Sequence, residues 1–317
     1  MSKHITVCAG IDTSKRKLDV ALEGTNEQQQ VTTTPEGHER LLEWLRRRGV
    51  NRIGIEASGG YEFAVVATLR RHGFVVVVFQ PAQVRAYATF HLQRAKNDKI
   101  DAALIASCTR DVKKIHAPPD PRLATFAGPL TAIEQMTDDL TRLKTRRESC
   151  HDARLWQLWK EEIARLKKLQ KAEFKALVAA IRQHQDLARR LALINSVDGI
   201  GLPTAVAILV RLPEIGRITR EQAAALSGLA PYDDDSGTYM GARHIAGGRE
   251  RLRGALYAAA LPAAFRWNPQ LIALYGRLTG AGKLHKVALV ACARKLLIFA
   301  NTVVARDTPW VSQAGAA

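Results

Sequence analysis

The sequence is poor in cysteine and lacks long apolar runs. Its four cysteines are scattered among 317 residues and form no Cys-x-x-Cys pair, which excludes a disulfide framework and a zinc ribbon. Reduced thiols of this kind are typical of a cytoplasmic protein. No run of about 18 uncharged apolar residues occurs, and the N-terminus leads directly into a strand-like segment. We therefore expect neither a signal peptide nor a membrane partner.

Acidic residues are also scarce relative to basic ones. The chain has 47 Lys and Arg against 30 Asp and Glu, which gives a net charge of +17 and a pI near 10.1. Such an excess indicates a polyanionic partner, most often nucleic acid. The length is sufficient for two or three domains that each have a hydrophobic core.

The first hundred residues alternate between strand and helix patterns. Apolar or β-branched segments predict five strands, over 6–11, 18–22, 28–34, 52–55 and 74–79. A predicted helix begins at Pro35, a second follows residues 57–60, and a third begins near Asp98. Three strands followed by helix, strand, helix, strand and helix is the order of the RNase H-like fold, so we expect an α/β fold of this class.

Four acids occupy positions where this fold would bring them together. Asp98 and Asp101 are three residues apart and therefore share one helix face, while Asp12 and Glu56 end the first and fourth predicted strands. A structural alternative is that Asp98 caps the helix and Asp101 lies at its positive dipole end. Four carboxylates in this topology favour a site for one or two Mg²⁺ ions, which prefer oxygen ligands and assist phosphodiester chemistry.

Two further acids, Asp19 and Glu62, are left out of this predicted cluster. Neither strand alternation nor helix position gives a reason for their side chains to face it.

Three segments of this region carry a family resemblance. GIDTSK at 10–15, GIEASGGY at 54–61 and AKNDKIDA at 95–102 resemble the insertion-sequence transposases with a RuvC-like DEDD domain, known as bridge-RNA-guided recombinases. The resemblance implies that Asp12, Glu56, Asp98 and Asp101 are the metal-binding acids, in that order. The family commonly has Thr or Ser where Asn97 stands here, a departure that affects no carboxylate.

The middle of the chain changes in character after a proline-rich break at 116–121. Two apolar stripes at helical spacing then run through a densely charged segment and predict two long antiparallel helices. We therefore expect a RuvC-like domain at 1–117, a helical hairpin or coiled coil at 122–190, and a mostly α-helical C-terminal transposase domain at 191–307.

The last third is basic and rich in glycine, with eleven Lys or Arg and one acid between 237 and 306. Ser236 at the edge of this segment is either a turn residue or a nucleophile for a phosphodiester. The segments 228–231, 236–237, 241 and 252–257 resemble the C-terminal domain of the same family, which implies that Ser236 forms a covalent phosphoserine with DNA. We expect nearby arginines to bind nucleic acid, namely Arg243, Arg249, Arg251 and Arg253.

The favoured function is a site-specific DNA recombinase that is guided by a structured non-coding RNA. Its expected partners are donor and target DNA, the guide RNA, and further copies of the chain in a dimer or tetramer. A metal-dependent RuvC-like nuclease or junction resolvase is the alternative enzyme, and Ser236 would be irrelevant to it. A nucleic-acid-binding scaffold with a decayed site is a third hypothesis, which the presence of all four acids and the serine disfavours.

Overall fold

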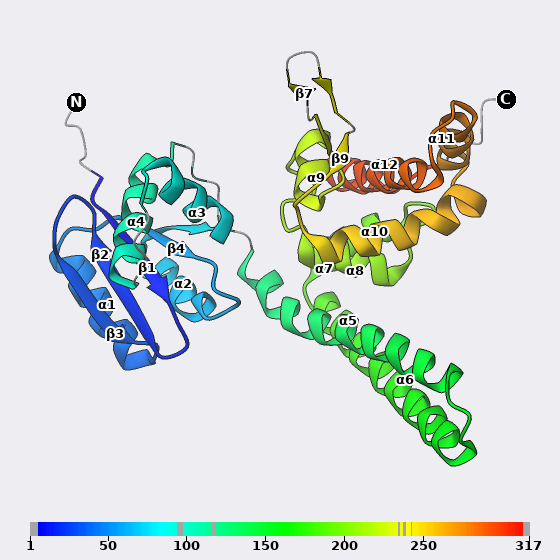
Figure 1. Ribbon diagram of the computed structural model, residues 1–317, viewed down its shortest axis with the longest axis horizontal. Helices are drawn as coiled ribbons and strands as arrows, with labels where there is room; N and C mark the ends of the chain where they lie inside the picture. The colour runs from blue at the N-terminus through cyan, green and yellow to red at the C-terminus, as the bar shows by residue number, and fades with distance from the viewer. Residues whose placement is uncertain are drawn as a thin grey trace. The chain divides into compact units, whose positions relative to one another are not determined.

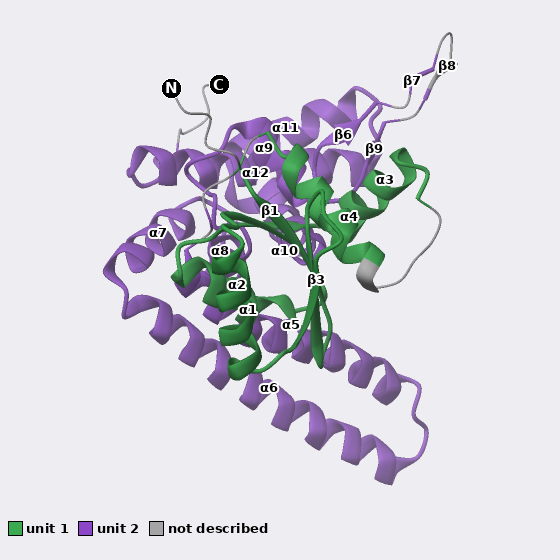
Figure 2. Cartoon of the chain, turned by 90° about the vertical axis from the view of Figure 1, so that its left-hand side faces the viewer, with its two compact units in different colours: residues 1–117 green, residues 118–317 purple. Residues whose placement is uncertain are grey.

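The computed structural model describes residues 6–93, 98–113, 115, 118, 120–233, 235–236, 239–241 and 243–312, with the backbone alone described at 98, 99, 239 and 240. The chain divides into two compact units, residues 1–117 and 118–317 (Figure 2). Each unit has its own hydrophobic core.

The N-terminal unit is built on a mixed five-stranded sheet (Figure 1). The strands are β1 (Cys8–Thr13), β2 (Lys17–Leu22), β3 (Gln28–Thr32), β4 (Arg52–Glu56) and β5 (Val75–Phe79). Their order is β3-β2-β1-β4-β5; β1, β2 and β3 pair antiparallel, while β1 with β4 and β4 with β5 pair parallel. This arrangement agrees with the predicted RNase H-like order.

Helices cover both faces of the sheet. They are α1 (Pro35–Arg47), α2 (Glu62–Arg71), α3 (Pro81–Phe90) and α4 (Asp98–Asp111). One face packs on α1 and α2 through alternating side chains such as Ile11 and Ile55, and the other face meets α3 and α4 through Phe79 and Ile105. The central strands β1, β2 and β4 are therefore buried along most of their length, while the edge strands β3 and β5 are partly exposed.

Two glycines let α4 lie directly on the sheet. Gly10 of β1 and Gly54 of β4 are register partners, and a Cβ built on Gly10 would lie 2.2 Å from both the Ala102 carbonyl oxygen and the Ala106 amide nitrogen. A Cβ on Gly54 would likewise collide with the Thr109 hydroxyl. Any side chain at these positions would push the helix away from the strand ends.

The C-terminal unit is helical apart from a small β-ribbon (Figure 1). Its helices are α5 (Pro121–Glu148), α6 (Ala153–Arg182), α7 (Gln185–Asn195), α8 (Leu202–Arg211), α9 (Arg220–Ser227), α10 (Glu250–Pro262), a π-helical turn (Ala263–Trp267), α11 (Pro269–Gly280) and α12 (His285–Arg306). The long helices α5 and α6 pack along one another through a small cluster formed by Leu140, Leu143, Ile163 and Leu166. Asp120 and Asp152 cap their N-termini by accepting backbone N–H bonds.

Helix α12 is the central element of this unit. It is long and apolar enough to pass the length and composition test for a membrane span, but more than half of its most apolar window is buried inside the protein. It packs against α7, α9, α10 and α11, and its buried residues include Leu289, Leu296 and Ala300. These contacts are those of a core helix in a globular unit.

Candidate active site

Asp12 and Glu56 lie on the same face of the sheet, toward the ends of adjacent parallel strands. Side chains alternate along a strand, so Asp12 shares the face of Gly10, and Glu56 shares the face of Gly54. That face is the one covered by α4, and both acids are half-buried. The two acids thus lie toward adjacent strand ends, while their binding of a metal stays a prediction.

The direction of α4 brings its first turn to these strand ends. Just after the C-terminus of α4, the Val112 carbonyl oxygen accepts a hydrogen bond from Arg52 Nη1 at the start of β4, at 3.3 Å. The middle of α4 lies on Gly10 of β1. The N-terminal turn therefore lies over the opposite ends of the strands, where Asp12 and Glu56 are found. Asp101 is half-buried in this turn, while the side chain of Asp98 lies outside the described residues.

Asp19 is an acid at this face that sequence reasoning missed. It is the register partner of Asp12 in the antiparallel β1–β2 pair, and directly opposite residues project from the same face. Its side chain is 8% exposed, accepts a hydrogen bond from Gln30 Nε2 at 2.6 Å, and lies 3.2 Å from Lys17 Nζ. The exclusion of Asp19 by strand alternation was wrong, because the turn at 14–16 fixes a register that the sequence pattern does not reveal.

Glu62, the other omitted acid, shapes the loop that follows Glu56. Its buried carboxylate accepts hydrogen bonds from the Ser58 amide at 3.1 Å, the Ser58 hydroxyl at 3.3 Å and the Gly60 amide at 2.9 Å. The Ser58 hydroxyl also bonds to that of Thr13, the residue after Asp12. Glu62 thus links the ends of β1 and β4, which is a role in positioning and not in metal binding.

The donor set suits a hard divalent cation. Carboxylate oxygens from two strand ends and a helix N-terminus are the ligands that Mg²⁺ prefers. Among the side chains that the structure describes, which exclude Asp98, no group of three or more His, Cys, Asp or Glu is close enough to hold an ion. Metal binding by the four acids therefore stays a prediction; Asp12 and Glu56 share one face of the sheet, and Asp101 lies in the first turn of the helix that covers it.

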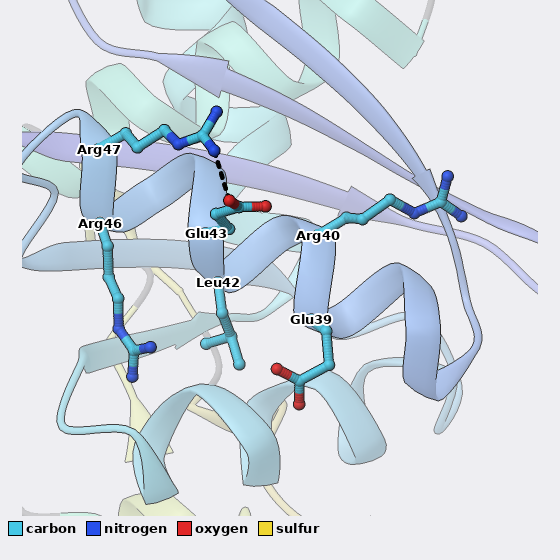
Figure 3. Close-up of a pocket in the computed structure, with 6 residues that line it drawn as sticks. All are labelled: Glu39, Arg40, Leu42, Glu43, Arg46 and Arg47. Atoms are coloured by element: carbon cyan, nitrogen blue, oxygen red, sulfur yellow. Dashed lines mark hydrogen bonds and ion pairs between the residues drawn. The ribbon is translucent and has the colours of Figure 1, made fainter.

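The two hollows found in the N-terminal unit are open to solvent, and neither is a closed substrate pocket. A hollow of about 350 Å³ lies on the outer surface of α1 and is lined by Glu39, Arg40, Leu42, Glu43, Arg46 and Arg47, with Glu43 paired to Arg47 (Figure 3). A second, of about 290 Å³, has Asp19 and Ala102 in its lining. The α1 hollow is a solvated face of alternating charge on the opposite side of the sheet, so it is not part of the acidic site.

Ser236 lies on a β-ribbon of the C-terminal unit that is made of two successive two-stranded pairings. Strand β6 (Pro231–Tyr232) pairs with β9 (His244–Ile245), and β7 (Asp235–Ser236) pairs with β8 (Tyr239–Met240) further out. Ser236 is exposed, and its hydroxyl has no hydrogen-bond partner among the described residues. The hydroxyl is accessible to a substrate, but no described group within this unit activates it.

The aspartates that precede Ser236 stabilise the ribbon. Asp233 forms an ion pair with Arg243 at 2.6 Å, and the Asp235 carboxylate accepts a hydrogen bond from the Gly241 amide at 3.2 Å. Asp234 lies outside the described residues. Two of the three negative charges are therefore used to hold the ribbon strands together.

The four arginines predicted to bind nucleic acid all have partners within the protein. Arg249 forms two hydrogen bonds to Glu214, at 2.8 and 2.7 Å, and Arg251 lies 3.3 Å from Glu134. Arg243 is paired with Asp233, as above. An ion pair reduces the field that an arginine presents to phosphate, so contact with nucleic acid stays a prediction for these three.

Arg253 differs from the other three because its hydrogen-bond partner is a neutral backbone carbonyl. Its Nη1 donates to the Gly247 carbonyl at 2.6 Å. Gly228, which ends α9 in a left-handed conformation with φ of 69°, is so close that an added Cβ would lie 2.3 Å from that same Arg253 nitrogen. The glycine-rich segment thus packs tightly around a guanidinium that keeps its full positive charge.

Two family models match the chain, one in each unit. Residues 9–153 match a DEDD-type transposase model of IS110 elements, and residues 191–276 match the model described as transposase IS116/IS110/IS902 family. The first matched range includes all four predicted acids, and the second includes Ser236 and the four arginines. A DEDD-type domain implies the use of a divalent metal in general.

Relatives that resemble the chain include two proteins of matching length. The pilin gene-inverting proteins of Moraxella bovis and Moraxella lacunata are each 26% identical over 318 residues, which cover 95% of this chain and 96% of the relative. An uncharacterized 43.6 kDa protein of insertion element IS110 from Streptomyces coelicolor is 31% identical over 105 residues, or 32% of this chain and 26% of that protein.

Proposed function

Because the chain carries both transposase domains of the IS110 family, we propose that it is a site-specific DNA recombinase that joins DNA through a phosphoserine at Ser236. The observation that supports this most is the common sheet face shared by Asp12, Glu56 and α4, in the domain that matches the DEDD-type model. Two full-length relatives are named for the inversion of a pilin gene, which is a recombination of DNA.

The N-terminal unit would supply the metal site. Asp12, Glu56, Asp98 and Asp101 would hold Mg²⁺, which stabilises negative charge on phosphate and lowers the pKa of a bound hydroxyl. The protein's own contribution is to fix the acids. Glu62 and Thr13 link the two strand ends, and Gly10 allows α4 to approach them.

The serine would carry the covalent step. Attack of the Ser236 oxygen on a DNA phosphorus forms one phosphoester bond and breaks another, and the departing sugar oxygen takes up a proton. The number of phosphoester bonds is unchanged, so a strand can be rejoined by the reverse step without an external energy source. Because no described residue of its own unit contacts the Ser236 hydroxyl, activation would come from the acidic site.

That activation would occur between copies of the chain. We propose a homo-oligomer in which the acids of one subunit act on Ser236 of another, and in which a structured RNA selects the DNA sequences. The net charge of +17 supports a polyanionic partner of this kind.

Recombination of the DNA that flanks the chain's own gene tests the proposal. Cells that carry a plasmid with this DNA express the wild-type protein, the Asp12→Asn variant or the Ser236→Ala variant. New DNA junctions are then amplified and sequenced. Wild type should give junctions, and each variant should give none. The two variants expressed together should restore part of the activity, because one complete site can form from the two intact halves.

RNA that copurifies with the wild-type protein should contain one enriched species, and its absence would remove the RNA from the proposal.

A metal-dependent nuclease is the second candidate, and the acidic face of the N-terminal unit alone would be sufficient for it. In that case Ser236→Ala would cleave DNA normally, while Asp12→Asn would be inactive.

A further inference from the structure

An aromatic cluster lies at the surface of the C-terminal unit, where the π-helical turn, α11 and α12 meet. It consists of Phe265, Tyr275 and His285. The Phe265 and Tyr275 ring centroids are 4.8 Å apart in an edge-to-face arrangement, and the Tyr275 hydroxyl lies 2.7 Å from His285 Nδ1. Although these three rings support one another, 54% of Phe265 is exposed to solvent.

The exposure of Phe265 is fixed by the residues around it. Ala263 and Ala264 on the same turn are fully buried, and Ala263 packs so closely on Gly199 that an added Cβ there would lie 2.4 Å away. Asn268, also buried, donates to the Asp198 carbonyl and caps α11 through the Leu271 amide. The turn is therefore anchored on both sides of Phe265, and π-helical turns occur frequently at functional sites.

The chain segment that carries the cluster has charge of one sign. Residues 251–306 contain nine Lys or Arg and no Asp or Glu. Arg266, Lys283 and Lys286 are exposed neighbours of the cluster in sequence, and none of them forms an ion pair within the described part of the chain. A second copy of this surface would bring like charges together, whereas a strand of nucleic acid would bring phosphates to the lysines and a flat base to the ring.

We propose that the aromatic cluster binds an unpaired nucleotide of single-stranded nucleic acid. One base stacks on the exposed face of Phe265, and the adjacent phosphates lie near Lys283 and Lys286. The inference rests on the proposed function only in taking nucleic acid as the partner. Stacking of this kind is tolerant of base identity, because every base has an aromatic face.

Binding of short labelled strands by the full-length chain tests this inference. Fluorescence anisotropy is measured with single-stranded DNA and single-stranded RNA of about 12 nucleotides and mixed sequence, over a series of salt concentrations. Phe265→Ala should weaken binding about 10-fold at every salt concentration, because it removes a stacking contact and no charge. Lys286→Ala should instead reduce the slope of log affinity against log salt by about 0.7.

Two replacements at Phe265 separate stacking from simple apolar contact. Phe265→Trp should keep the affinity, while Phe265→Leu, which keeps apolar area but lacks a ring, should lose as much as Phe265→Ala. Leu158→Ala, which truncates an exposed apolar side chain on α6, is the matched control and should bind as wild type does. A loss confined to RNA or to DNA identifies which strand occupies the cluster, and either one supports the inference.

The inference is overturned if Phe265→Leu binds like wild type, or if Phe265→Ala leaves strand binding intact and instead weakens self-association in sedimentation. No cleavage is needed for this assay. If the stacking inference fails in this assay, the proposal of recombination by the wild-type chain still stands. If recombination is not observed, strand binding can still be measured and interpreted.

Discussion

Asp12 and Asp19 lie directly opposite each other on antiparallel strands β1 and β2 and project from the same face of the sheet. Two carboxylates at this separation repel each other unless positive charge lies between or beside them. Lys17 and Gln30 contact the Asp19 carboxylate at 3.2 and 2.6 Å, so part of its negative charge is compensated beside Asp12.

Replacement of Asp19 should weaken metal binding without removing the reaction. In Asp19→Asn the ion pair with Lys17 is lost and this face of the sheet carries one negative charge fewer, so the Mg²⁺ concentration for half-maximal activity should rise about 10-fold, with activity recovered at saturation. Asp12→Asn should be inactive at every Mg²⁺ concentration. Glu23→Gln is the control, because Glu23 pairs with Arg110 near the other end of α4 and its loss should not change the Mg²⁺ dependence. An Asp19→Asn variant with wild-type Mg²⁺ dependence would place Asp19 outside the site.

The approach of α4 to β1 should depend on Gly10. Gly10→Ala forces a methyl group onto the Ala102 and Ala106 backbone and should lower the free energy of unfolding by about 3 kcal/mol or more. Gly128→Ala is the matched variant, since Gly128 is helical and an added Cβ meets nothing within 4 Å, so it should stabilise the chain by up to about 1 kcal/mol. Urea unfolding measures both. Equal stability of the two variants would contradict the close packing.

Acid should weaken a charge cluster at the base of the helical hairpin. Arg122 donates to Asp120 and to Asp186, and these hydrogen bonds hold the pKa of each carboxyl below its ordinary value of 3.8. A depressed folded-state pKa stabilises the fold above the ordinary value, and this contribution is lost as the pH falls through the folded-state pKa. The melting temperatures of wild type and Arg122→Gln should therefore differ near neutral pH and converge as the pH falls below 3.8 and through the lowered pKa of the two carboxyls.

The control for this measurement is Lys171→Gln, which removes a cation that forms no ion pair in the described residues. Its difference from wild type should stay constant with pH. A constant difference for Arg122→Gln as well would show that the cluster does not contribute to stability. The effect should be modest, because Arg122 and Asp186 are more than a third exposed.

One thiol of four should react under native conditions. Cys8, Cys108 and Cys292 are buried, and burial raises the pKa of each thiol, that of Cys292 to about 11. Cys150, between α5 and α6, is only half-buried. A thiol reagent should label one group rapidly in the native protein and all four in denaturant, and Cys150→Ser should remove the rapid phase. Rapid labelling of Cys150→Ser would indicate that the core opens.

The strand order and the acids at strand ends could be predicted because both depend on local patterns. The valine run at 75–78 forms the predicted strand, but it lies at the sheet edge with Val75 and Val78 exposed, so the expectation that it is buried was wrong. Asp12 and Glu56 follow apolar segments directly. Registers depend on turn geometry instead, which is why the Asp12–Asp19 pair was missed. Glu62 was missed for a related reason, since its partners are backbone amides of a loop whose shape no periodicity reveals.

The arginines show a further limit of sequence reasoning. The sequence pattern predicts that Arg249 and Arg251 belong to a basic surface. Their partners in the structure, Glu214 and Glu134, are 35 and 117 residues away in the chain. Long-range ion pairs of this kind depend on tertiary packing. The aromatic cluster likewise combines residues from three elements that only the fold brings together.

The most direct test of the account is the chemical identity of the link between protein and DNA. Wild-type chain is incubated with Mg²⁺ and DNA that contains its recombination site, quenched in denaturant, digested, and analysed by mass spectrometry. The account predicts a nucleotide attached to Ser236, absent from Ser236→Ala and from Asp12→Asn. DNA cleavage with no covalent adduct, or an adduct on another residue, would contradict it.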